Sequence, residues 1–287
     1  MSATHDGLLR DAAAALAAAG IENVRLEARL LLAKAAGATT EELIAWGAEE
    51  VPVEVARRLT GYVARRVRRE PMAYVLGERE FWGLPFRVSP AVLVPRPDSE
   101  TLIEAALAIL LDRHKPWRIL DLGVGSGCLL LTLLTEYPAA LGVGIDASSE
   151  ALSVARANAA ALGVGSRAEL GPGDWRIAGW GRCLPAPFDL VVANPPYIRR
   201  DEIAGLMPEV ARFEPRMALD GGADGLDAYR AIVAGVPHLV APGGHVLVEI
   251  GEGQGPDISA LFRSAGLPVE GHWKDLSGIE RVLGATH

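Results

Sequence analysis

Short apolar strands alternate with helices from Trp117 onward, and this alternation constrains the fold more than any other feature of the chain. Strands are expected at residues 118–121, 141–146, 188–193 and 245–250, and the helices that follow the first three end near residues 137, 162 and 240. Each crossover helix must lie on one face of the sheet, so both faces become covered. The pattern therefore predicts an α/β domain with a doubly wound, mostly parallel sheet.

The first part of the chain has a different pattern. Four short helices and no strand are expected at residues 12–19, 24–36, 40–46 and 53–69, and glycine or proline ends several of them. We therefore expect a helical domain over residues 1–72 and the α/β domain over residues 95–287. Between them, apolar residues at 74–76, 81–82 and 86–88 alternate around two glycines, which predicts a β-hairpin connector over residues 73–94. A helix is then expected from Asp98 or Ser99 to about Arg113.

Composition excludes several classes of protein. No run approaches the roughly 18 apolar residues of a membrane span, and the first residues lack the basic start and apolar run of a secretion signal. The two cysteines, Cys128 and Cys183, form no metal-binding or disulfide pattern. A net charge of −8 argues against long nucleic acid held by phosphate contacts alone. We expect a cytoplasmic protein without metal, membrane association or sequence-specific nucleic acid binding.

A glycine-rich turn follows the first of these strands. Gly123, Val124, Gly125, Ser126 and Gly127 come directly after Asp121-Leu122 and open a helix. Such a turn lies outside the carboxyl ends of the strands, where doubly wound folds bind ligands. The spacing is GxGxG rather than the GxGxxG that holds a pyrophosphate. It therefore favours a ligand without phosphate groups, although a purely structural turn is the alternative.

Two acidic positions near the next strands extend this site. Asp146 ends the second strand about 20 residues after the glycines, where an acid can accept hydrogen bonds from both hydroxyls of a ribose. Asp174 can accept from an adenine amino group, and Trp175 offers a flat surface for stacking. The alternatives are an Asp146 that caps the following helix and a Trp175 that belongs to the core. Together these residues indicate a nucleoside ligand.

The segment Asn194-Pro195-Pro196-Tyr197 follows the strand at 188–193 and is the most informative in the chain. Prolines carry no N–H group and restrict the residue before them, so this loop presents rigid carbonyl acceptors. The Asn194 side chain adds another carbonyl oxygen. Two acceptors of this kind suit an NH₂ group whose lone pair is delocalised, and they would hold that nitrogen pyramidal toward a methyl donor. We expect Asn194 and the Pro195 carbonyl to be these acceptors, with Tyr197 packed against the acceptor group.

With these residues in place, the chain resembles the bacterial protein-(glutamine-N5) methyltransferases of peptide chain release factors, also called the HemK or PrmC family. The resemblance extends over nearly the whole chain, including the helical first domain and the hairpin. The segments that carry it are 80–82, 95–100, 121–127, Asp146, 174–175, 194–197, 212–215, 218–219 and 221–226. The family usually carries Thr where this chain has Val124, so a hydroxyl contact is not expected there.

The resemblance implies a Rossmann-like, class I methyltransferase fold with S-adenosyl-L-methionine (AdoMet) as methyl donor. It implies a cofactor site at residues 123–127, Asp146, Asp174, Trp175 and Asn194, and a substrate site at residues 194–197. The acceptor implied is the glutamine of the GGQ motif in a release factor, and the products are N5-methylglutamine and S-adenosylhomocysteine. The partner would then be the release factor, and six arginines on the helix at 53–69 are either its docking surface or an ordinary solvated face. These are Arg57, Arg58, Arg65, Arg66, Arg68 and Arg69.

Other functions remain possible from the sequence alone. The Asn-Pro-Pro-Tyr loop also suits adenine-N6 methyltransferases of DNA or RNA, since adenine presents a conjugated NH₂ group. A glutamine of a ribosomal protein is a second alternative acceptor. A non-catalytic AdoMet-binding protein would be expected to carry a degraded acceptor loop, and a nicotinamide-dependent oxidoreductase would need GxGxxG. No role is assigned to Glu249 or Glu252.

Overall fold

A computed structural model describes residues 4–287. The chain divides into two compact units, one formed by Met1–Gly77 with Met207–Phe213 and the other by Glu78–Leu206 with Glu214–His287. We call these the helical unit and the catalytic unit and describe each by itself. Within residues 4–287, no helix is long and apolar enough to cross a membrane.

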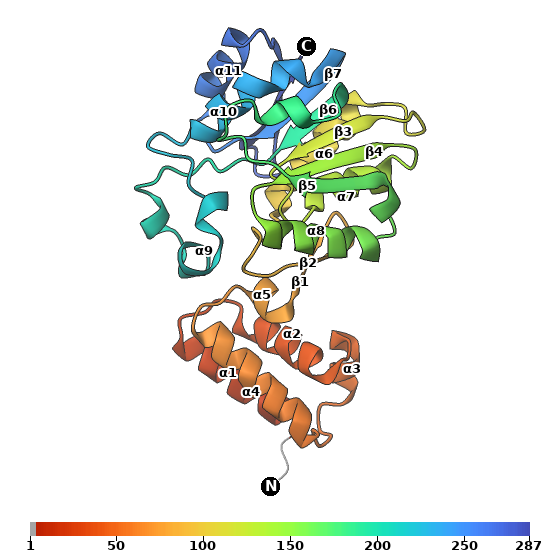
Figure 1. Ribbon diagram of the computed structural model, residues 1–287. Helices are drawn as coiled ribbons and strands as arrows, with labels where there is room; N and C mark the ends of the chain where they lie inside the picture. The colour runs from red at the N-terminus through yellow and green to blue at the C-terminus, as the bar shows by residue number, and fades with distance from the viewer. Residues whose placement is uncertain (1–3) are drawn as a thin grey trace. The chain divides into compact units, whose positions relative to one another are not determined.

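The helical unit contains the four helices that the sequence predicts. They are α1 (His5–Ala18), α2 (Val24–Ala36), α3 (Thr40–Ala45) and α4 (Val53–Val67), followed by the short α5 (Met72–Leu76). In Figure 1, α1, α2 and α4 lie side by side, and their buried leucines form one core. Helix α3 begins with a capping box, in which Thr39 accepts from the Glu42 amide and Glu42 accepts from the Thr39 amide.

A short segment from the second half of the chain belongs to the helical unit. Helix α9 (Pro208–Phe213) carries Glu209, whose carboxylate accepts hydrogen bonds from Arg66 at 2.9 Å and from Arg69 at 3.0 Å. The Arg66 side chain is only 8% exposed and also donates to Glu27 at 2.8 Å. The arginine-rich helix α4 therefore holds α9 within this unit.

The predicted hairpin over residues 73–94 is partly wrong. Residues 74–76 lie in helix α5, which starts after Pro71 and ends at Gly77 in the left-handed conformation. Three apolar residues in a row do not distinguish a strand from a helical turn, which explains the error. The hairpin itself consists of β1 (Glu78–Phe81) and β2 (Leu84–Arg87). Its two turn residues, Trp82 and Gly83, both have positive φ, as a type I′ turn requires.

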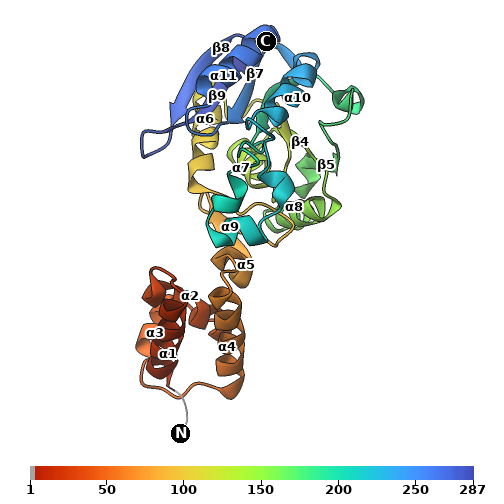
Figure 2. The same cartoon turned by 90° about the vertical axis from the view of Figure 1, so that its left-hand side faces the viewer.

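The catalytic unit contains one seven-stranded sheet in the order β5-β4-β3-β6-β7-β9-β8 (Figure 1). The strands are β3 (Arg118–Leu122), β4 (Leu141–Asp146), β5 (Ala168–Pro172), β6 (Phe188–Ala193), β7 (Val240–Glu249), β8 (Val269–Lys274) and β9 (Glu280–Thr286). Neighbours from β5 to β7 pair in parallel, whereas β9 and β8, labelled in Figure 2, pair antiparallel at one edge. The predicted doubly wound, mostly parallel sheet is confirmed.

Helices cover both faces of this sheet. Helices α6 (Glu100–Ile109), α7 (Cys128–Glu136) and α8 (Ser149–Ala161) pack over one core, and α10 (Asp227–Gly235) and α11 (Gly255–Ser264) over the other. Adjacent strand residues alternate between these cores, as Ile119 and Leu120 do on β3. Helix α6 ends at Ile109 rather than near residue 113, and α10 ends at Gly235 rather than at residue 240. Pro237 explains the second difference, because the residue before a proline disfavours a continuing helix.

The strand order places the sequence motifs together. The chain winds from β3 through β4 to β5 in one direction and returns to β6 on the other side of β3, so the order reverses between β3 and β6. In open α/β sheets, ligands bind at such a reversal, outside the carboxyl ends of the strands. The glycine turn follows β3, Asp146 ends β4, Asp174 follows β5 and Asn194 follows β6. Four neighbouring strands therefore deliver these residues to one edge.

Candidate active site

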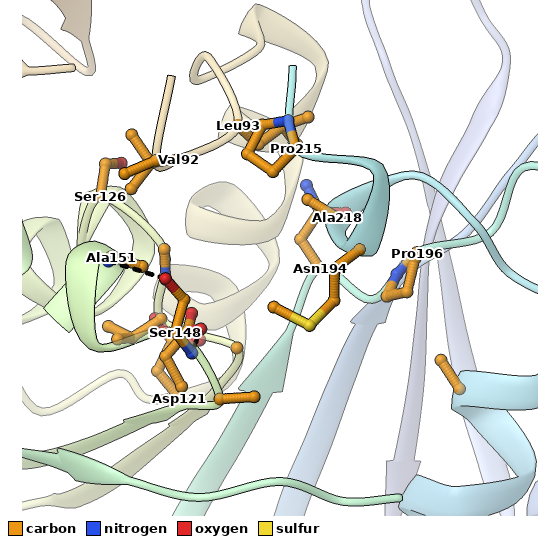
Figure 3. Close-up of a pocket in the computed structure, with 18 of the residues that line it drawn as sticks. Val92, Leu93, Asp121, Ser126, Ser148, Ala151, Asn194, Pro196, Pro215 and Ala218 are labelled. Carbon is orange, nitrogen blue, oxygen red and sulfur yellow. Dashed lines mark hydrogen bonds between the residues drawn. The ribbon is translucent and has the colours of Figure 1, made fainter. Parts of the chain in front are cut away.

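A cavity of about 530 Å³ opens at this edge, entirely within the catalytic unit. Figure 3 shows Asp121, Ser126 and Ser148 on one side of it and Asn194 and Pro196 on the other. Ser99 and most residues of segments 91–96 and 215–218 also line it. Of the residues that the sequence predicts for the cofactor and the acceptor, those that line the cavity are Gly123, Val124, Gly125, Ser126, Asp146, Asp174, Trp175, Asn194 and Pro196. Gly127, Pro195 and Tyr197 are not among the lining residues.

The glycine turn is closed against β4 and lies under Trp175. The amides of Gly123 and Val124 both donate to the Ile145 carbonyl at 2.9 Å. Gly123 has φ +75°, and a β-carbon there would lie 2.7 Å from Cη2 of Trp175. Only glycine allows both this backbone conformation and this close approach. The indole ring is thereby held against the turn at the cavity wall.

Asn158 fixes the far end of the turn. This residue on α8 is fully buried, and its Nδ2 donates to the Ser126 carbonyl at 2.8 Å and to the Arg87 carbonyl at 3.0 Å. Its Oδ1 accepts from the Arg87 amide at 2.8 Å. Asn158 thus joins the turn to strand β2, a role that no sequence motif indicates.

Asp146 is held by backbone amides on both sides. Its Oδ2 accepts from the Gly125 amide and its Oδ1 from the Ser148 amide, each at 2.9 Å. Helix α8 has its own cap, because the Ser148 hydroxyl accepts from the Ala151 amide at 3.1 Å, as drawn in Figure 3. Asp146 therefore connects the glycine turn to the loop after β4. Each of its carboxylate oxygens can accept a further hydrogen bond from the cavity.

Asp174 and Trp175 both reach the cavity, with different surroundings. Asp174 is paired with Arg176, which donates Nε to Oδ1 at 2.8 Å and Nη2 to Oδ2 at 2.7 Å. Hydrogen bonding to Arg176 lowers the pKa of Asp174, so this carboxylate is ionised at neutral pH. Trp175 is partly buried and also packs against the core beneath α10 and α11.

Asp121 is a site residue that the sequence analysis did not assign. Its carboxylate is 1% exposed and lines the cavity, and Oδ2 accepts from the Leu130 amide at 3.3 Å. Within residues 4–287, Oδ1 has no hydrogen-bond partner although it is buried. Burial raises the pKa of Asp121 to about 7, and the nearby Asp146 carboxylate adds to this effect. A cationic group of a ligand could bind this buried carboxylate, because a nearby positive charge favours its ionised form.

The loop at residues 194–197, which we call the acceptor loop, packs closely against the glycine-rich segment at 221–226. A β-carbon at Gly221 would lie 2.8 Å from the Pro196 carbonyl oxygen, so the segment at 221–226 can pack directly on the loop. Gln254 donates to the Tyr197 carbonyl at 3.1 Å. The Tyr197 ring packs toward the core, and its hydroxyl donates to Glu249 at 3.4 Å. The contact predicted between Tyr197 and an acceptor group stays a prediction.

Two segments of the resemblance meet beside the cavity. Arg96 donates to Oε1 of Glu214 at 2.6 Å, and the Glu214 side chain is 1% exposed. Burial raises the pKa of Glu214, and the Arg96 guanidinium opposes this rise. The ion pair holds the segment that starts at Glu214 against residues 94–96, and both segments contribute to the cavity wall.

The arginines of α4 are largely occupied within the helical unit. Arg57 pairs with Glu54, Arg58 donates to the Ala35 carbonyl, and Arg65 pairs with Glu70. Arg66 and Arg69 hold Glu209, as described above. These contacts favour a structural role for most of the cluster over the predicted docking surface.

Comparisons with known proteins agree with this architecture. Residues 7–77 match the family model of the PrmC N-terminal domain, and residues 119–213 match that of a methyltransferase domain. A solved methyltransferase from Pyrococcus furiosus superposes with a TM-score of 0.51 at 15% identity, covering 72% of this chain and 90% of that one. This structural likeness supports the fold.

Two relatives show to which family the chain belongs. The chain is 48% identical over 268 residues to the release factor glutamine methyltransferase of Rhodospirillum rubrum, covering 93% of this chain and 80% of that protein. It is 46% identical over 278 residues to the protein of the same name from Cereibacter sphaeroides, covering 96% of each. The chain belongs to the release factor glutamine methyltransferase family.

Proposed function

We propose that this protein transfers the methyl group of AdoMet to the side-chain amide nitrogen of the glutamine in the GGQ motif of a peptide chain release factor. The products are N5-methylglutamine and S-adenosylhomocysteine. The observation that carries the proposal is the cavity, where a nucleoside-binding edge faces the acceptor loop at Asn194. The names of the two relatives support the choice of acceptor.

The residues on one side of the cavity fit AdoMet. Asp146 can accept from the ribose hydroxyls, and Trp175 offers its ring beside the Gly123 backbone for the adenine. The unpartnered Oδ1 of Asp121 fits the α-ammonium group, because a buried carboxylate oxygen without a donor favours a cationic partner. Gly125, Ser126 and the other cavity residues of the turn allow close backbone approach. When bound, AdoMet supplies an electrophilic methyl group on its sulfonium.

The residues on the other side fit a planar NH₂ group. The lone pair of an amide nitrogen is delocalised into its carbonyl, with a rotation barrier of about 18–20 kcal/mol as a measure of that delocalisation. Acceptors placed off the amide plane favour a pyramidal nitrogen, whose lone pair then becomes available. The Asn194 carbonyl oxygen and the Pro195 carbonyl are the acceptors in this proposal. The alkylated nitrogen becomes acidic and loses its proton afterwards, so no general base need act before transfer.

We propose that the helical unit docks the release factor. The residues that line the cavity begin at Ala91, so residues 4–77 are not required to form it. This division leaves the helical unit available for a macromolecular partner. Contacts within the unit occupy Arg57, Arg58, Arg65, Arg66 and Arg69, and in this proposal the release factor binds elsewhere on the surface of the unit.

The function is tested by offering three classes of acceptor with labelled AdoMet. Purified release factors, ribosomal proteins and DNA are incubated with the protein, and transferred label is counted on each. We expect label on a release factor and its loss when the GGQ glutamine is changed to alanine. Label on DNA or on a ribosomal protein alone would contradict the proposal.

A further inference from the structure

A chain of three polar side chains leads from the cavity into the sheet. Nδ2 of Asn194 donates to Oγ of Ser99 at 3.2 Å, and Oγ of Ser99 donates to Oε2 of Glu249 at 2.5 Å. Asn194 follows β6, Glu249 ends the neighbouring strand β7, and Ser99 immediately precedes α6. Ser99 and Glu249 are both 2% exposed. The three residues are far apart in the sequence and meet only in the folded catalytic unit.

The surroundings of the Glu249 carboxylate combine hydrogen-bond donors with one cation and one further acid, among residues 4–287. Its Oε1 accepts from the Tyr197 hydroxyl at 3.4 Å, and its main-chain carbonyl accepts from the Tyr229 hydroxyl at 2.7 Å. The charged groups that act on it are Arg281, which favours its ionised form, and Asp98, which opposes it. Burial raises the pKa of Glu249 to about 7. Glu249 can therefore change its protonation state near neutral pH.

The protonation state of Glu249 determines which way the Asn194 amide can face. An ionised carboxylate only accepts hydrogen bonds, so Ser99 must donate its one hydrogen to Glu249. The Ser99 oxygen can then only accept, and the amide group of Asn194 that faces it must be NH₂. The carbonyl oxygen of Asn194 is left to face the other way. A protonated Glu249 removes this constraint, because Ser99 can then donate to the Asn194 oxygen.

We propose that Ser99 and Glu249 are positioning residues that fix the amide of Asn194 with its carbonyl oxygen directed toward the acceptor nitrogen. The inference rests on the proposed function and assigns Glu249 the role that the sequence left open. Both act through Asn194: Ser99 lines the cavity beside Asn194, and Glu249 lies behind Ser99. They keep the Asn194 amide in the one orientation in which its carbonyl oxygen can accept a hydrogen bond from the acceptor nitrogen.

The proposal predicts a loss of turnover rather than of cofactor binding. Ser99→Ala removes the acceptor of the Asn194 NH₂ group together with the charge-assisted hydrogen bond to Glu249, and we expect kcat to fall about 10-fold to 100-fold. Ser99→Thr keeps the hydroxyl and should restore most of kcat. The affinity for AdoMet should change less than about 3-fold in both variants, because each keeps Asp146 and Trp175.

The pH profile separates positioning from a merely structural role. In the wild type, kcat should fall as the pH drops through about 7, because protonation of Glu249 releases the amide. Glu249→Gln cannot ionise and should lose this dependence on Glu249 together with most of kcat. The matched control is Glu252→Gln, a change at an exposed glutamate in the turn after β7 that should leave kcat and its pH profile unchanged.

A second readout does not depend on the acceptor. The side-chain NH₂ signal of Asn194 in a ¹⁵N spectrum of the full chain, assigned by its loss in Asn194→Ala, should be protected from exchange at pH 8. This protection should be lost in Ser99→Ala and at pH 6. If the signal behaves so while no release factor is methylated, the proposed function fails and the positioning role stands. Unchanged protection and wild-type kcat in Ser99→Ala, or an equal loss of AdoMet binding and kcat, would overturn the positioning role.

Discussion

The indole ring of Trp175 packs so closely on Gly123 that a β-carbon at the glycine would lie 2.7 Å from it. Gly123→Ala should displace this ring and weaken AdoMet binding by about 10-fold, the loss of one stacking contact. The matched control is Gly163→Ala. Gly163 has a similar φ of +71°, but a β-carbon there meets no atom within 4 Å.

Both alanine variants should lose about 1–2 kcal/mol of stability from the left-handed backbone, whereas only Gly123→Ala should lose affinity. Calorimetric titration with AdoMet and thermal unfolding measure the two effects. Equal AdoMet affinities in the two variants would show that Trp175 does not bind the cofactor.

Asp121→Asn tests the buried carboxylate. The variant keeps the shape of the side chain but removes the charge, and AdoMet affinity should fall about 10-fold to 100-fold at pH 8. In the wild type, affinity should fall as the pH drops through about 7, because protonation neutralises Asp121. Titration calorimetry from pH 6 to pH 8 checks this, and a wild-type profile in Asp121→Asn would contradict it.

The ionised Asp121 carboxylate should favour AdoMet binding but lower the stability of the ligand-free fold. Its pKa in the folded protein is raised above the unfolded value of 3.8, so the folded state holds the proton more tightly. The stability that this raised pKa contributes to the folded state is therefore fully present below pH 3.8 and is lost as the pH rises through about 7. We expect Asp121→Asn to unfold at a higher temperature than the wild type at pH 8 without ligand. A lower melting temperature would show that the charge stabilises the fold.

Glu209→Ala should destabilise the helical unit. The Glu209 carboxylate accepts from Arg66 and Arg69, and its removal leaves Arg66, 8% exposed, with Glu27 as its remaining carboxylate partner. We expect a loss of about 1–3 kcal/mol, together with faster amide exchange in α9. Glu202→Ala is the control, because the Glu202 side chain is 60% exposed. Unchanged exchange in α9 would mean that these ion pairs do not hold it.

Asn194→Ala separates chemistry from cofactor binding. Losing one acceptor that acts mainly in the transition state costs about 10²–10³ in kcat. AdoMet binding should fall far less, because Asp121, Asp146 and Trp175 remain. Asn194→Asp should show intermediate turnover, since it keeps an acceptor oxygen but adds a charge that must be desolvated. If Asn194→Ala bound AdoMet poorly yet turned over normally at saturating cofactor, Asn194 would be a cofactor ligand only.

The sequence predicts the four neighbouring parallel strands β4, β3, β6 and β7, and it misses β5, β8 and the buried strand β9. Strands β4 and β6 have the predicted bounds because each is a short, mostly apolar run bounded by turn residues. Strand β5 is absent from the predicted strands; it lies at the sheet edge, and none of its residues is fully buried. Strand β8 alternates half-buried and exposed residues and was also missed. A half-exposed edge needs little apolar sequence, so its pattern is weak.

Sequence patterns predict the site residues that directly follow the strands, but not the residues that only tertiary packing brings to the site. The glycine turn, Asp146 and Asn194 could be placed together from the sequence, because the carboxyl ends of neighbouring parallel strands share one edge. Ser99 and Glu249 could not, since they are 150 residues apart and their contact depends on the packing of α6 against β7. The arginines of α4 are a similar case, because the sequence does not reveal that Arg66 pairs with Glu27 and Glu209.

The position of the transferred methyl group tests the proposed function most directly. A release factor methylated by this protein is digested, and the GGQ-containing peptide is fragmented in a mass spectrometer. We predict the added methyl group on the side-chain amide nitrogen of the GGQ glutamine, with yield reduced about 10²–10³-fold when the Asn194→Ala variant is used. A methyl group on another residue, or an equal yield with Asn194→Ala, would contradict the account.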